Sequence, residues 1–159
     1  FLTDNRTRGF YEYIDIGNSY VQSNILGALG VSQLAKIEWM NSRRREIAQY
    51  YIESLSGIPG LDFLRVTEGS ETNWHIFGIL VPSEDKYWVM DALHAEGIMS
   101  NVHYTPLHLN RFYKELSDDM NMSGSIEFFR RLLRLPVYPS LSDDEMHKVA
   151  EAVIKVFNF

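Results

Sequence analysis

Cysteine is absent from this chain of 159 residues, and positive charge is in short supply. Without cysteine the protein forms no disulfide, has no thiolate metal site and no cysteine nucleophile. Its 15 lysines and arginines are outnumbered by 21 acidic residues, for a net charge of -6. A general nucleic-acid-binding protein needs a basic face that displaces counterions from phosphates, so no nucleic-acid partner is expected. No apolar run approaches the ~20 residues of a membrane-spanning helix, so no membrane partner is expected either.

Several catalytic motifs are also missing from the sequence. It contains no glycine-rich phosphate loop, no His-Glu-x-x-His metal motif and no Gly-x-Ser-x-Gly nucleophile motif. His103 and His108 lie close in sequence, but no third ligand follows at a spacing typical of zinc sites. We therefore expect neither a metal site nor a complete set of catalytic residues in this chain.

The apolar residues that are present, 45% of the chain, suffice for one domain with a core. Their spacing predicts helices over 23–55 (one helix, or two joined near Asn41–Ser42), 83–97, 109–116, 125–133 and from a capping box at Ser142 onward. Strands are predicted over 61–66, 74–81 and 98–102. This order predicts an α+β domain, with helices packed on one face of a small, mostly antiparallel sheet.

The most distinctive stretch is the loop Asn101 to His108, which contains His103, Tyr104 and His108 after a predicted strand. Ring nitrogens and a phenol in one loop can bind an anion, a sugar hydroxyl or a carboxylate. The loop alone equally suits a turn with solvated rings, because isolated histidines and tyrosines usually have structural roles.

Other side chains receive structural interpretations. His75 lies in an apolar segment and is interpreted as a core or interface histidine. Every lysine is interpreted as a surface residue, with nothing nearby to desolvate its amine. Apolar residues near the beginning of the chain are expected to pack on another domain or subunit: Phe10, Tyr13, Leu26, Leu29 and Trp39.

Several segments, in the same order along the chain, resemble one protein family. They are Ile14–Tyr20, Gly27–Leu34, Arg44–Tyr51, His103–His108 and Leu132–Pro136. Together they resemble the C-terminal domain of the DegT/DnrJ/EryC1/StrS sugar aminotransferases. That family depends on pyridoxal 5'-phosphate and has the aspartate-aminotransferase-like fold, fold type I. The resemblance implies that residues 1–159 are the small, C-terminal domain of such an enzyme.

The resemblance also implies roles for individual residues. A large domain before Phe1 would hold most of the cofactor and its lysine, and residues 1–22 would be a segment packed on that domain. Asn18, Ser19 and Tyr20 would face the cofactor phosphate of the neighbouring subunit. The residues implied to bind the sugar nucleotide are Asn5, Arg6, His103, Tyr104 and His108. No catalytic residue is implied within the chain.

The motif Ile14–Tyr20 is most similar to one branch, the dTDP-4-amino-4,6-dideoxygalactose transaminases. The wider family favours Gly-x-Asn-x-Arg-Met here, whereas this chain has Ser19, Val21 and Gln22 in place of the asparagine, arginine and methionine. These departures fit the branch.

The branch implies transfer of an amino group from glutamate to a 4-keto-6-deoxy sugar nucleotide, of the dTDP-4-dehydro-6-deoxyglucose type. Such an enzyme would be a cytoplasmic homodimer that serves surface polysaccharide synthesis, including lipopolysaccharide. The chain by itself would be inactive, because the lysine-bearing domain lies outside it. The alternative is a truncated or split, non-catalytic chain that acts as an interaction or structural domain.

Overall fold

Two units, divided between Ala35 and Lys36, make up the chain in a computed structural model. The structure describes residues 17, 20–115 and 121–158. In the first unit, α1 spans Asn24–Leu34, and the Ser23 side chain caps it by accepting a hydrogen bond from the Leu26 amide. Among the described helices, none is both long and apolar enough to cross a membrane.

The second unit begins with the helix α2, Ile37–Leu55. The predicted join near Asn41–Ser42 is wrong, because α1 ends at Leu34 and Asn41–Ser42 lies inside α2. Asparagine and serine lower helix propensity by only a few tenths of a kcal/mol, which tertiary packing readily offsets. The packed face of α2 consists of Ile47, Ala48, Tyr51 and Leu55, at helical spacing.

A small antiparallel sheet follows, in the order β1-β2-β3. Its strands are β1 (Asp62–Phe63), β2 (Phe77–Leu80) and β3 (Leu132–Leu135). The first two are shorter than predicted. The third strand was not predicted, because the sequence predicted a helix that continues to Leu133. In the structure the helix α5 (Ser123–Arg131) ends at Arg131, and Leu132 already has extended backbone angles. A short leucine-rich run has no periodicity that separates strand from helix.

The strand predicted over 98–102 is also wrong. Only Asn101 makes a ladder contact there, an isolated antiparallel bridge to Arg134. The Asn101 amide donates to the Arg134 carbonyl at 3.3 Å, and the Arg134 amide donates back at 2.8 Å. This single bridge fixes the start of the histidine loop at the free edge of β3.

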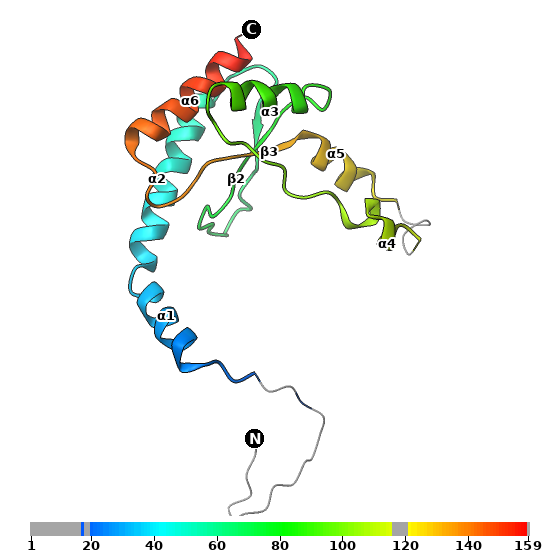
Figure 1. Cartoon of the computed structure of the whole chain (residues 1–159). Coiled ribbons are helices and arrows are strands. Elements are labelled where there is room, and N and C mark those ends of the chain that lie inside the picture. Colours follow the sequence, from blue (N-terminus) through cyan, green and yellow to red (C-terminus); the bar gives the residue numbers. More distant parts are fainter. Residues whose placement is uncertain (1–16, 18–19, 116–120, 159) are drawn as a thin grey trace, which may run out of the picture. The chain divides into compact units, whose positions relative to one another are not determined.

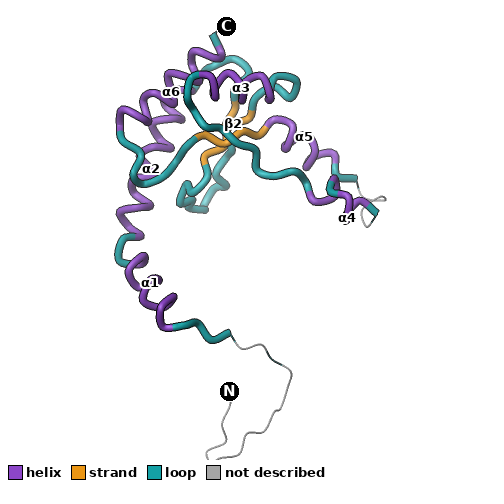
Figure 2. The backbone as a smooth tube through the Cα atoms, in the orientation of Figure 1, coloured by secondary structure: helices purple, strands orange, loops and turns teal. Residues whose placement is uncertain are grey.

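Helices cover one face of the sheet, as predicted. Phe77, Ile79, Leu133 and Leu135 point into the core cluster, which also contains buried residues of α2, α3 (Lys86–Ala95) and α6 (Asp143–Phe157). Figure 1 shows α2 and α6 side by side with α3 above the strands, and Figure 2 shows the same layers by element type. The capping box at Ser142 is confirmed, with Glu145 as its partner.

The stretch predicted as a helix over 109–116 divides into two short pieces. The 3-10 helix η1 spans Leu107–Leu109, and α4 spans Arg111–Lys114. Together with α5, which contacts β2, they follow the histidine loop along the chain (Figure 1).

Candidate functional site

Local hydrogen bonds hold the histidine loop in place. Besides the bridge at Asn101, the Nε2 atom of His94 lies 3.0 Å from the carbonyl oxygen of Ser100. The Asn101 side-chain oxygen accepts a hydrogen bond from the Val102 amide at 2.8 Å. These contacts come from α3, from β3 and from the loop itself, so the backbone leading into His103 is anchored on the rigid part of the unit.

His103 and Tyr104 form an adjacent pair of rings. Their centroids are 3.8 Å apart with an interplanar angle of 32°, and the peptide bond between them is cis. The Tyr104 side chain is 69% exposed, while His103 is half-buried. The pair thus offers a planar surface and a phenol to a ligand from solvent.

The surroundings of His103 disfavour the protonated form of its imidazole. Partial burial lowers its pKa, and the positive charges of Arg134 and His75 lower it further. Its Nδ1 atom is buried without a hydrogen-bond partner, and so is Nε2 of His108. A buried polar atom without a partner is costly unless something satisfies it, so both nitrogens have unused hydrogen-bonding capacity.

The predicted site residues are only partly brought together. His103 and Tyr104 are in contact, but no ring contact or hydrogen bond among the described residues joins them to His108. Tyr20 belongs to the other unit and is 89% exposed. The remaining predicted residues, Asn5, Arg6, Asn18 and Ser19, lie outside the described residues.

Two residues near the loop were not predicted as functional. Arg134 lies on β3 as a charged residue among buried leucines. A single arginine in a leucine run was the one signal in the sequence that its side chain points away from the core. His75 was predicted to be a core or interface histidine, but it is exposed, with its Nδ1 atom 2.9 Å from the Asn73 side-chain oxygen. The core interpretation is wrong because β2 begins only at Phe77.

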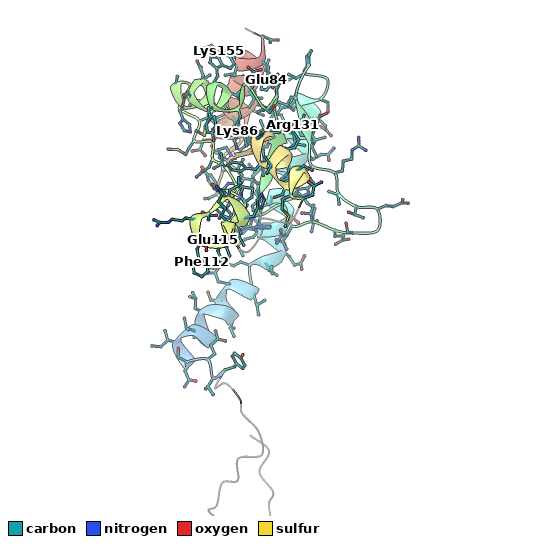
Figure 3. All side chains as sticks on the ribbon, turned by 90° about the vertical axis from the view of Figure 1, so that its right-hand side faces the viewer. Glu84, Lys86, Phe112, Glu115, Arg131 and Lys155 are labelled. Atoms are coloured by element: carbon teal, nitrogen blue, oxygen red, sulfur yellow. The ribbon has the colours of Figure 1, made fainter. Side chains whose placement is uncertain are left out.

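The surface interpretation of every lysine is wrong for Lys86. Its side chain is buried, its ammonium donates to the Phe129 carbonyl at 2.5 Å, and burial lowers its pKa. Figure 3 shows Lys86 between α3 and α5. The amine contacts Phe129, and none of its partners among the described residues belongs to the histidine loop, so we interpret Lys86 as a structural residue that joins two helices.

Within residues 17, 20–115 and 121–158, no group of three or more histidine or acidic side chains is placed to hold a metal ion. The groups present at the site are rings, a phenol and an arginine, which suit organic and anionic ligands.

The chain is similar to known proteins over most of its length. The family model of the DegT/DnrJ/EryC1/StrS aminotransferases matches residues 3–154. The chain belongs to this family. The structural neighbours of this DegT/DnrJ/EryC1/StrS chain are sugar aminotransferases of fold type I, which confirms the predicted fold class.

Three individual proteins illustrate the similarity. The spore coat polysaccharide biosynthesis protein SpsC of Bacillus subtilis is 32% identical over 152 residues, covering 91% of this chain and 39% of SpsC. Helicobacter pylori PseC, an aminotransferase involved in the biosynthesis of pseudoaminic acid, has a TM-score of 0.83 and 25% identity over 96% of this chain. Spr1654 of Streptococcus pneumoniae, solved in a PLP-form, has a TM-score of 0.76 and 29% identity over 86% of this chain.

This DegT/DnrJ/EryC1/StrS chain spans only part of each of these proteins. It covers 39% of SpsC, 42% of PseC and 36% of Spr1654. The activity of the whole protein is accordingly taken up below as a proposal.

Proposed function

We propose that the chain is the small, C-terminal domain of a pyridoxal-phosphate-dependent sugar-nucleotide aminotransferase. The amino group would move from glutamate to a 4-keto-6-deoxy sugar nucleotide of the dTDP-4-dehydro-6-deoxyglucose type, for surface polysaccharide synthesis. The family match over residues 3–154 supports the reaction class, and SpsC supports the polysaccharide context. The enzyme would act as a cytoplasmic homodimer.

The histidine loop is the observation that carries the substrate half of this proposal. The His103–Tyr104 pair offers an exposed phenol, a planar ring surface and an imidazole with an unsatisfied nitrogen. Sugar hydroxyls and phosphate oxygens need such donors and acceptors, and a ring can pack on the sugar or the base. Nε2 of His108 adds a second unpartnered nitrogen in the same loop.

Pyridoxal phosphate would supply the electron sink for the transfer. Its phosphate would be approached by Asn18, Ser19 and Tyr20 of the neighbouring subunit, an amide, a hydroxyl and a phenol that all suit phosphate oxygens. Asn5 and Arg6 would contact the sugar nucleotide from the same segment. The large domain would hold the rest of the cofactor.

Half-reaction kinetics test this proposal in a full-length protein that carries this sequence. His103→Ala and Tyr104→Phe should slow the half-reaction with sugar nucleotide by about ten- to a hundredfold, the cost of a hydrogen bond to a charged or polar group. The half-reaction with glutamate should change little. His147→Ala is the matched control, because His147 is an exposed histidine on α6.

Equal loss in both half-reactions would make the loop structural. No transamination at all by the full-length wild type would overturn the proposed function. The alternative, a non-catalytic interaction domain, draws on the exposed apolar side chains of α1, among them Ile25, Leu26 and Leu29. It predicts that the protein as expressed in its source cells carries no lysine-bearing cofactor domain, which mass measurement of that protein would decide.

A further inference from the structure

Arg134 is a positive charge directly beside the start of the histidine loop, because its backbone bridges to Asn101. It is half-buried on β3, where Leu133 and Leu135 on the opposite face fill the core. Among the described residues, the ion pairs are made by Arg43, Arg131 and Lys155, and none includes Arg134. Partly burying a guanidinium costs free energy unless an anion pairs with it, and the described residues supply no carboxylate in an ion pair with Arg134.

The backbone fixes where this guanidinium can reach. Arg134 pairs with Gly78 on one side and with Asn101 on the other, so it is held between β2 and the start of the histidine loop. Gly78 has no side chain, and an added Cβ there would approach Leu132 and Leu64 to 2.8 Å and 3.0 Å. The arginine is thus set at the edge of β3, within electrostatic reach of His103, and it lines the same cavity as His75.

A cavity of about 520 Å³ opens at this edge of the sheet. Its lining includes Arg134, Lys148, His75 and Asn101, which provide positive charge, ring nitrogens and an amide. The lining also includes Glu145, but that carboxylate already accepts hydrogen bonds from the Ser142 amide and hydroxyl, each at 2.8 Å. The charged side chains of the lining therefore carry a net positive charge in a chain whose overall charge is -6.

We infer that Arg134, with Asn101 and His75 beside it, forms a subsite for an anionic group, a phosphate or a carboxylate, of the ligand that the His103–Tyr104 pair contacts. A guanidinium binds both kinds of oxyanion through paired, charge-assisted hydrogen bonds. The inference rests on the proposed function for the identity of that ligand. The anion would be a phosphate of the sugar nucleotide or a carboxylate of glutamate.

Binding to the 159-residue chain tests the subsite without any catalysis. Pyrophosphate and L-glutamate are titrated separately into the wild type while amide NMR signals of Asn101 and Arg134 are followed. We expect at least one of the two anions to shift these signals, and Arg134→Gln to weaken its binding by about tenfold or more. Arg130→Gln, which removes an exposed arginine of α5, is the matched control and should leave binding unchanged.

Two further measurements keep the test decisive if Arg134→Gln fails to fold. Arg134→Lys preserves the charge and should retain part of the affinity. In the wild type, the bound anion should slow the modification of Arg134 by phenylglyoxal, read by peptide mass mapping, and should leave Arg130 unprotected. Pyrophosphate protection assigns the subsite to the sugar nucleotide, and glutamate protection assigns it to the amino donor.

The inference is overturned if neither anion shifts the signals or protects Arg134, or if Arg130→Gln weakens binding as much as Arg134→Gln. The proposed function fails separately, when the full-length protein binds the anion through Arg134 but transfers no amino group.

Discussion

The ammonium group of Lys86 lies 3.9 Å from the centroid of the Phe129 ring and donates a hydrogen bond to the carbonyl of the same residue. One side chain thereby joins the beginning of α3 to the last part of α5. The carbonyl and the ring both favour the charged amine, yet burial is the dominant effect and lowers its pKa. This contact makes Lys86 a buried cation whose protonation is coupled to folding.

The stability of the chain should therefore depend on Lys86 at alkaline pH. Because the pKa of Lys86 is lower in the folded state, the unfolded chain binds more protons, and the free energy of unfolding contributed by this group rises with pH. The rise begins near the folded-state pKa and ends above the ordinary value of 10.5. Urea unfolding at several pH values should show this rise in the wild type and in Lys36→Met, but not in Lys86→Met. If the free energy of unfolding had the same pH dependence in the wild type and in both variants, Lys86 would not be buried as described.

Gly78 should tolerate no larger residue. A Cβ at this position would lie 2.8 Å from Leu132 Cδ1 and 3.0 Å from Leu64 Cδ1, so both leucines must move. We expect Gly78→Ala to lower the free energy of unfolding by about 1–3 kcal/mol through overpacking. Gly124→Ala, where nothing lies within 4 Å of the added atom, is the control for thermal unfolding. Equal melting temperatures for the two variants would count against the tight contact.

Self-association of the chain should increase with concentration. The side chains of Leu26, Leu29 and Trp39 are 53%, 55% and 59% exposed, as expected for residues that pack on another domain or subunit. Apolar surface of this kind favours association in water. Light scattering across a concentration series should show growing mass for the wild type and less growth for Leu26→Gln/Leu29→Gln. A constant monomer mass at high concentration would contradict this prediction. The other two residues expected to pack on a partner, Phe10 and Tyr13, lie outside the described residues.

The titration of His103 should reveal its neighbours. Burial first, and then the charges of Arg134 and His75, lower its pKa below the ordinary value of 6.5. NMR titration of the imidazole signals should place the midpoint below this ordinary value, and Arg134→Gln should raise it. A midpoint unaffected by Arg134→Gln would show that the guanidinium does not lie within electrostatic reach of His103.

Sequence patterns that span only a few residues or helical turns predicted several features of the fold and the family. The capping box at Ser142, the packed face of α2 and the α+β class all follow from local spacing, and the family follows from short segments in a fixed order. The loop with His103 and Tyr104 was also recognisable, because its residue types are adjacent in sequence. Such features depend on neighbours along the chain, which the sequence states directly.

Only the tertiary structure decided the features that depend on distant residues. Strand β3 exists because Leu133 and Leu135 pair with Ile79 and Phe77, although the same leucines also fit the end of a helix. Lys86 is buried because Phe129 lies over it, and Arg134 approaches His103 because Asn101 bridges to β3. In each case the deciding partner is far away in sequence, and local periodicity carries no information about which distant segments pack together.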